Sequence, residues 1–230
     1  MNIVSDLSEV TQLMATPFGL ASLSVTFHVL GYMAFIFFSE TMKYKPNSIS
    51  WLMFAYGTTI TAVLEKEVGA PLPLLMLPAI CAIFSVWVAY RCLTNGNAEL
   101  PKHPLDWLAL ATDITITVCY FLVSHMMERG MITPEIREHV VLGLLVAATS
   151  GSILPFIPQI RGMLDGSVTE HWLPWILWSL AYAFLAITTL SIHGLNGSLI
   201  LYPLINLVLH ILVFLLAVFL PRKPQLDTVQ

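Results

Sequence analysis

Residues 153–186 read ILPFIPQIRGMLDGSVTEHWLPWILWSLAYAFLA, and this stretch decides how the rest of the sequence is interpreted. An apolar run ends at Pro158-Gln159, and a polar link follows over residues 161–171. A second apolar run then begins with three tryptophans spaced three residues apart, Trp172, Trp175 and Trp178. Proline ends or kinks a helix, and tryptophan favours the interface between a bilayer and water. The stretch therefore predicts two membrane helices joined by a short loop.

The composition predicts an α-helical polytopic membrane protein. Of the 230 residues, 57% are hydrophobic and 10% are charged, whereas soluble domains carry about 25% charged residues. The net charge of −4, without a block of Lys or Arg, gives no reason to expect nucleic acid as a partner. Three cysteines fit neither a disulfide framework nor a metal cluster, so we expect no metal and no cofactor. The acidic start MNIVSDLSEV lacks the basic region of a cleaved signal peptide.

Polar gaps divide the chain into apolar runs, most of which approach the roughly 20 residues that cross a bilayer. Seven runs are present, at 17–38, 49–64, 71–91, 105–125, 139–160, 172–192 and 198–220. On the side of the N-terminus the loops carry three basic residues, Lys66, Arg129 and Arg137. The opposite side carries seven, Lys43, Lys45, Arg91, Lys102, Arg161, Arg222 and Lys223. The positive-inside rule then places the N-terminus outside and the C-terminus in the cytosol.

The first three runs and the last three share a weak but ordered similarity. Residues 37–51 align with residues 156–172, and residues 74–84 align with residues 199–209. The alignment pairs Ser39-Glu40 with Pro158-Gln159, Trp51 with Trp172, Pro78 with Pro203, and Cys81 with Asn206. Two three-helix copies can share one orientation only if a single span separates them. We therefore expect two parallel three-helix repeats joined by a linker helix, residues 105–125.

The sequence features resemble those of one membrane-protein superfamily. Proline and glutamine before a polar link and a Trp-rich helix resemble the PQ-loop motif of cystinosin-like, SWEET-like and KDEL-receptor-like proteins. The seven-helix, 3+1+3 pattern is similar to the SWEET-like (MtN3-like) transporters. The expected division is an N-terminal tail (1–16), a first bundle (17–92), a linker helix with flanking loops (93–138), a second bundle (139–220) and a cytosolic tail (221–230).

This resemblance implies a transporter rather than an enzyme. It would move a small polar organic solute, such as a sugar, an amino acid or a vitamin-like compound, by alternating access between the two bundles. The bilayer is the expected surrounding, in a plasma, inner or organelle membrane, and a homo-oligomer is possible. The alternative is a receptor or sorting protein that recognises a small ligand or a peptide without transport.

The resemblance also places the solute site among the second, third, sixth and seventh runs. Asn206 resembles the substrate-contacting asparagine of SWEET-like proteins, although such an amide can also bond a helix backbone. Trp175 and Trp178 resemble the Trp-x-x-Trp pattern of vitamin transporters, and their rings suit stacking on a solute or packing between helices. Three further candidates for substrate binding are Tyr182, Cys81 and Phe54.

Hinge and proton-coupling residues complete the predicted site. Proline removes a helix hydrogen bond and allows a kink. The hinge or gate candidates are Pro158, Gln159, Glu40, Pro78 and Pro203. Asp113 is the only acid well inside an apolar run, so it is a candidate for proton coupling or a hydrogen-bonded packing residue. We expect each of three single histidines to bond a carbonyl group, namely His28, His193 and His210.

Overall fold

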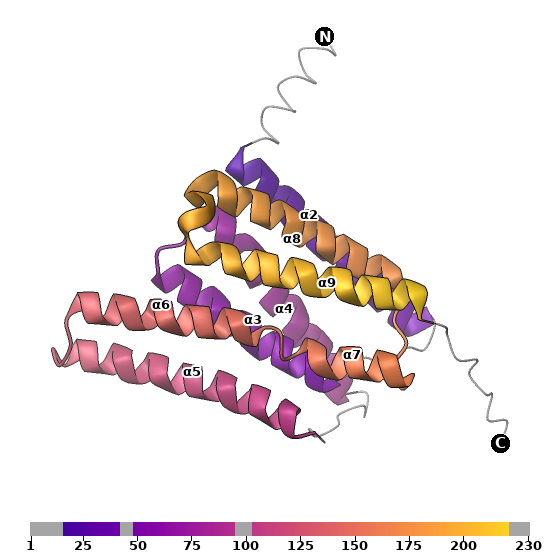
Figure 1. The fold of residues 1–230 in the computed structure, drawn as a ribbon, viewed down its shortest axis with the longest axis horizontal. Helices are drawn as coiled ribbons and strands as arrows, with labels where there is room; N and C mark the ends of the chain where they lie inside the picture. Colours follow the sequence, from indigo (N-terminus) through magenta and orange to yellow (C-terminus); the bar gives the residue numbers. More distant parts are fainter. Residues whose placement is uncertain (1–15, 42–47, 95–102, 221–230) are drawn as a thin grey trace, which may run out of the picture.

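The structure is a computed structural model, and it describes residues 16–41, 48–94 and 103–220. These residues form helices joined by short turns (Figure 1). The helices are α2 (Pro17–Thr41), α3 (Ser48–Glu67), α4 (Leu72–Thr94), α5 (Pro104–Glu128), α6 (Pro134–Gly151), α7 (Phe156–Asp165), α8 (Trp172–His193), η1 (Gly194–Asn196), η2 (Ser198–Ile200) and α9 (Leu201–Phe219). The predicted cytosolic tail and most of the N-terminal tail lie outside the described residues, as do Lys43, Lys45, Lys102, Arg222 and Lys223.

Six segments of the described chain are long and apolar enough to cross a membrane, in agreement with the predicted class. They are Pro17–Glu40, Leu72–Thr94, Pro104–Glu128, Pro134–Asp165, Trp172–His193 and Ser198–Phe219. The second predicted span, helix α3, is not among them. Its sequence contains two serines and three threonines as well as three charged residues at its end, and these lower its hydropathy. Apolar composition alone therefore supports six spans.

The fifth predicted run is divided between two helices. Helix α6 ends at Gly151, and Pro155 occupies the N-cap of α7. The nitrogen of Pro155 cannot donate to the preceding turn of α6, which accounts for the break. Pro158 is the third residue of α7, where backbone N–H groups have no partner within the helix, so proline is tolerated there. The prediction that the apolar helix ends at Pro158-Gln159 is therefore wrong in detail.

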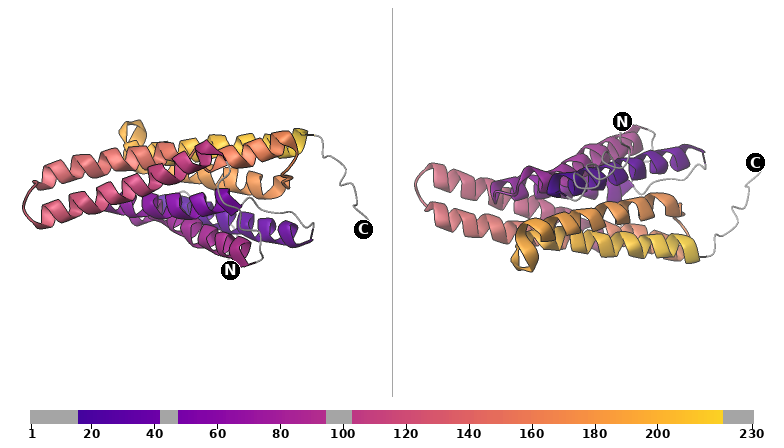
Figure 2. Two further views of the ribbon diagram at one scale, coloured as in Figure 1. Left: turned by 90° about the horizontal axis from the view of Figure 1, so that it is seen from below. Right: turned by 90° about the horizontal axis from the view of Figure 1, so that it is seen from above.

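The helix contacts follow a regular pattern. Helix α2 packs on α8 and α4, α3 packs on α4 and α6, and α9 packs on α8 and on both α6 and α7. Helix α5 lies outside, against α6 and α3. Both views of Figure 2 show the α5–α6 hairpin extending beyond the other helices at one end.

Two polar contacts join α2 to α8 within this arrangement. Ser24 donates from its Oγ to the carbonyl oxygen of Ala181 at 2.7 Å. Trp178 donates from its indole Nε1 to the carbonyl oxygen of His28 at 3.1 Å. Because hydrogen bonds between helices have no competing water in an apolar interior, they fix the register of the pair. The first half of the chain is thereby joined to the second.

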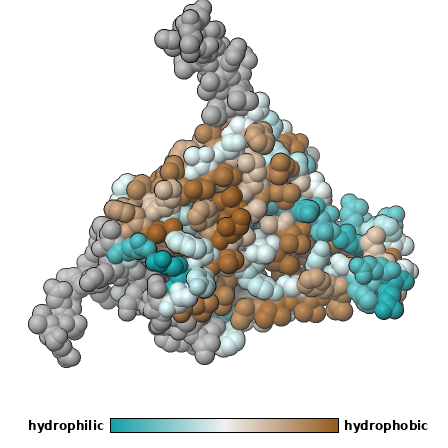
Figure 3. All heavy atoms as spheres, turned by 180° about the vertical axis from the view of Figure 1, so that it is seen from behind, coloured by the Kyte–Doolittle hydropathy of each residue, from teal (hydrophilic) through white to brown (hydrophobic). Residues whose placement is uncertain are grey.

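The surface matches a chain that meets lipid along its length. Figure 3 shows hydrophobic residues over most of one face and hydrophilic residues gathered at the end where α5 and α6 are joined. At this end Arg137 of α6 pairs with Glu67 of α3. At the opposite ends of α2 and α4, Arg91 pairs with Glu40 at 2.8 Å. These two ion pairs lie at helix ends, where water can reach them.

Candidate functional site

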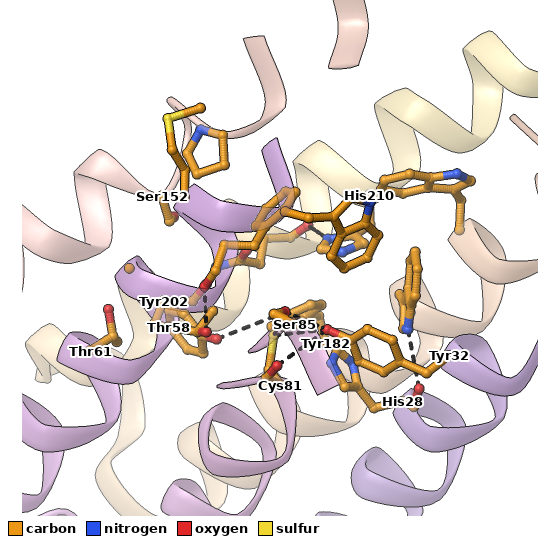
Figure 4. A pocket seen from close by; sticks show the side chains of 18 residues that line it. His28, Tyr32, Thr58, Thr61, Cys81, Ser85, Ser152, Tyr182, Tyr202 and His210 are labelled. Atoms are coloured by element: carbon orange, nitrogen blue, oxygen red, sulfur yellow. Dashed lines mark hydrogen bonds between the residues drawn. The ribbon is translucent and has the colours of Figure 1, made fainter. Parts of the chain in front are cut away.

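A cavity lies among α2, α3, α4, α8 and α9, next to the break between α6 and α7. Figure 4 draws the 18 side chains that line it. The contributing residues are His28 and Tyr32 of α2, Trp51, Met53, Phe54, Gly57, Thr58 and Thr61 of α3, Cys81 and Ser85 of α4, Ser152 and Pro155 at the break, Trp175, Trp178 and Tyr182 of α8, and Tyr202, Asn206 and His210 of α9. The cavity therefore draws its wall from both halves of the chain.

All six residues that the sequence suggested for substrate binding line this one cavity. They are Asn206, Trp175, Trp178, Tyr182, Cys81 and Phe54. They come from four helices and are up to about 150 positions apart in the sequence, so no local pattern dictates their meeting. Their contact with a solute stays a prediction.

Asn206 makes a contact within its own helix. Its side-chain Nδ2 donates to the carbonyl oxygen of Tyr202, one turn earlier in α9, at 3.0 Å. Its neighbour His210 bonds the carbonyl oxygen of Asn206 through Nδ1 at 2.7 Å. The amide is buried, with 4% of its surface exposed. The Nδ2 group is thus satisfied within α9, and the side chain lines the cavity.

Hydroxyl and thiol groups form a polar cluster across the cavity (Figure 4). The hydroxyl of Tyr32 lies 2.8 Å from the Oγ of Ser85 and 3.5 Å from the Sγ of Cys81. The hydroxyl of Tyr182 lies 3.3 Å from that of Tyr202 and 4.0 Å from the same sulfur. This polar cluster joins α2, α4, α8 and α9. Hydroxyl groups both donate and accept, so the cluster can exchange partners with a polar solute.

His28 is the polar side chain of the cavity that has no partner. Both of its ring nitrogens are buried and lack a hydrogen bond within the described residues, and 1% of its surface is exposed. Its ring meets the edges of Tyr32 and Tyr182, with centroid distances of 5.1 and 5.6 Å. The prediction that His28 bonds a carbonyl group is therefore wrong, whereas His210 does so. An unpaired buried imidazole is costly unless a ligand meets it.

The cavity carries no formal charge on its wall. None of the described residues that line it is Asp, Glu, Lys or Arg. The space open to the centres of water-sized molecules is about 30 Å³. That space can hold water, but an organic ligand needs a pocket on the order of 300 Å³ or more. The structure therefore describes a narrow cavity with a neutral, aromatic wall.

Gln159 of the Pro158-Gln159 pair is tied to the cavity wall through a residue that the sequence reading missed, Glu170. Gln159 donates from Nε2 to Oε1 of Glu170, and Trp175 donates from its indole Nε1 to Oε2 at 3.2 Å. All three side chains are buried. Burial raises the pKa of Glu170 to about 7, against the opposing effect of these two hydrogen bonds. The only sequence signal was an isolated acid just before the Trp-rich helix.

The remaining predicted residues lie outside the cavity. Glu40 is exposed in its pair with Arg91. Pro78 lies inside α4, and Pro203 lies in the first turn of α9. Asp113 is buried in α5, with its carboxylate 3.6 Å from the position that a Cβ on Gly57 would take. Its carboxylate thus sits behind the α3 wall of the cavity.

No metal site is present within the residues that the structure describes, since no three His, Cys, Asp or Glu side chains lie close enough together. The chain matches no known family model, no curated protein and no solved structure. The site must therefore be interpreted from its own chemistry.

Proposed function

We propose that this chain is a membrane transporter that moves a small, uncharged polar organic solute by alternating access between two three-helix bundles. The first bundle is α2, α3 and α4, the second is α6 with α7, α8 and α9, and α5 is the linker. With α3 as the seventh span, the N-terminus lies outside and the C-terminus in the cytosol. The observation that carries the proposal is the neutral aromatic cavity, whose wall comes from both bundles.

The pattern of helix contacts supports two parallel repeats. If α2, α3 and α4 correspond to α6, α8 and α9, then the contact of α2 with α8 corresponds to that of α6 with α3. The contacts of α3 with α4 and of α2 with α4 likewise correspond to those of α8 with α9 and of α6 with α9. These three contacts each have a counterpart, whereas the smaller contact of α4 with α8 has none of similar size between α9 and α3. This correspondence is what a two-fold axis along the membrane normal requires.

The chemistry of the wall supports an uncharged solute. An ammonium or carboxylate group that enters an apolar cavity without an opposite charge loses its hydration at a large cost. The cavity wall offers aromatic rings, hydroxyl groups, an amide and an imidazole instead. A sugar or an uncharged vitamin-like compound can stack on the rings and bond the polar groups. A peptide carboxylate, as a sorting receptor would bind, lacks an Arg or Lys partner there.

The narrowness of the cavity supports a cycle in which it widens to admit the solute. About 30 Å³ admits water but no organic solute. Entry then requires the bundles to separate on one side at a time. The break between α6 and α7 and Pro78 inside α4 supply places where a helix can bend.

A thermal-shift screen of the purified protein in detergent tests the proposal. The panel holds sugars, nucleosides, vitamins, amino acids and short peptides. A ligand that binds only the folded protein raises its melting temperature by mass action. We expect stabilisation by at least one uncharged sugar, nucleoside or vitamin. Stabilisation by peptides alone would instead support a receptor.

A further inference from the structure

Glu170 connects Gln159 of α7 by hydrogen bonds with Trp175 in the wall of the cavity. Its Oε1 accepts from Gln159 of α7, and its Oε2 accepts from Trp175 of α8. The fold of the intervening chain brings these groups together. Gly166 ends α7 with a φ of 77°, which favours glycine, and the backbone N–H of Val168 returns to the carbonyl oxygen of Gly162 at 2.8 Å. Glu170 is thereby turned back towards α7.

Trp175 connects Glu170 with the other aromatic side chains that line the cavity. Its ring packs edge-on against Trp178, with a centroid distance of 5.0 Å, and lies 5.6 Å from the ring of His210. All three rings line the cavity. A displacement of Trp175 must therefore move the aromatic wall, because tightly packed rings leave no space for independent movement.

We propose that Glu170 is a proton-controlled latch that holds the Gln159 segment of α7 to the cavity-lining Trp175 while ionised and releases that wall when protonated. Both partners present N–H groups to it: the indole of Trp175 can only donate, whereas the amide of Gln159 also has an oxygen that accepts. A carboxylate accepts at both oxygens, whereas a carboxylic acid carries a proton on one of them. A proton on Oε2 breaks the hydrogen bond with the Trp175 indole, and a proton on Oε1 breaks that with Gln159 unless its amide turns over. The pKa near 7, raised by burial, places this change close to neutral pH.

The other ionisable groups at this end of the bundle have their own contacts. Arg161 of α7 pairs with Asp106 of α5 at 3.3 Å. Asp165 accepts from the backbone N–H of Ser167 at 2.8 Å. His171 stacks on Phe38 of α2, with a centroid distance of 3.6 Å. Glu40 and Arg91, on α2 and α4, pair with each other. Within the described residues, the groups hydrogen-bonded to the Glu170 carboxyl are the two neutral donors.

Cys81 provides a native reporter of cavity opening that needs no solute. It lines the cavity and is buried, with 5% of its surface exposed. The other two cysteines, Cys92 and Cys119, are replaced by Ala so that methyl methanethiosulfonate can label Cys81 alone. The labelling rates of the Glu170→Gln variant and of the Glu170 protein are compared at pH 8.5 and at pH 5.5. Their ratio at one pH removes the effect of pH on the thiol itself.

At pH 8.5 we expect Cys81 to be labelled roughly tenfold faster in Glu170→Gln than in the Glu170 protein, because a glutamine can accept from only one of the two donors. At pH 5.5 the two rates become equal, since Glu170 is then protonated. Equal rates at both pH values would overturn the latch, and a ratio that does not change with pH would overturn its control by protons. Glu138→Gln, which replaces an exposed carboxylate of α6, is the control and should leave the rates unchanged.

A second variant covers the case in which Glu170→Gln does not fold. Gln159→Leu removes the amide that donates to Oε1 of Glu170, while the carboxyl group of Glu170 can still titrate. At pH 8.5 we expect Cys81 to be labelled faster in this variant than in the protein that keeps both Gln159 and Glu170. Because no solute enters these experiments, their outcome is independent of whether the protein transports one.

Discussion

The indole ring of Trp178 in α8 lies directly against the backbone of Gly31 in α2, with its Cδ1 only 2.5 Å from the position of a Cβ atom on residue 31. The same ring donates its N–H to the carbonyl oxygen of His28. Only a residue without a side chain allows this approach. The closeness of α2 and α8, and with it one side of the cavity, therefore depends on Gly31.

Gly31→Ala should displace Trp178 or separate α2 from α8. Overpacking of a buried contact costs about 1–3 kcal/mol, so we expect a lower unfolding temperature in detergent. Gly143→Ala is the matched control, because no atom lies within 4 Å of its added Cβ. There the greater helix propensity of alanine leaves stability unchanged or slightly raised. An equal loss of stability in the two variants would show that Gly31 has no special role in the contact between α2 and α8.

His28→Phe should raise the stability of the protein and abolish its binding of a ligand. Phenylalanine keeps the ring contacts with Tyr32 and Tyr182 but removes two buried nitrogens without partners. Relief of such groups is worth about 1–3 kcal/mol, so we expect a higher melting temperature together with loss of the ligand-induced shift. The exposed His193 supplies the control variant, His193→Phe, which should alter neither. A ligand-induced shift that survives in His28→Phe would exclude His28 from the binding site.

Asp113→Asn tests proton coupling through the linker helix. If Asp113 carries the coupled proton, solute exchange at equilibrium continues in the variant, while uphill accumulation stops. Both are measured in liposomes, with and without a pH gradient. Accumulation equal to that of the unaltered protein would assign Asp113 to packing behind Gly57 instead.

The stability of the protein should depend on pH through Glu170. Its pKa lies near 7 in the folded protein and at 4.5 ordinarily, so the folded state holds the proton more tightly than the unfolded state. The stabilising contribution of this proton is complete below pH 4.5 and is lost as the pH rises through 7. Its size is on the order of 3 kcal/mol. Desolvation of the carboxylate causes this change in the free energy of unfolding. The proposed latch concerns only which neighbouring groups form hydrogen bonds with the carboxyl group.

Melting temperatures at pH 5 and pH 8 check this dependence. The unaltered protein should lose stability relative to Glu170→Gln as the pH rises between these values. A difference between the two proteins that stays constant with pH would show that Glu170 does not titrate in this range.

The helical class and most spans could be predicted from the sequence because they depend on local composition. Runs of apolar residues about 20 long have few alternatives in a bilayer. The break at Pro155 could not be placed as readily, since two prolines, Pro155 and Pro158, compete to end the same helix. In the structure α6 ends at Gly151, before the first of them, and α7 begins after Pro155 and continues through Pro158.

The cavity residues likewise divide into those that could be predicted from the sequence and those that could not. Trp175, Trp178 and Asn206 were predicted because large aromatic and amide side chains are conspicuous in apolar helices. Gly31 and Glu170 were missed, because their roles arise from contacts with Trp178 and Trp175 that appear only once the chain is folded. A glycine in an apolar helix and an acid in a loop carry no such information by themselves.

Uptake by liposomes that contain the purified protein tests the proposed transport most directly. The solutes are those uncharged compounds that shift the melting temperature, supplied with radiolabel. We expect saturable uptake of at least one of them, and Asn206→Ala should abolish this uptake while the variant remains folded and monodisperse. Uptake no faster than in protein-free liposomes for every such solute would contradict the transporter.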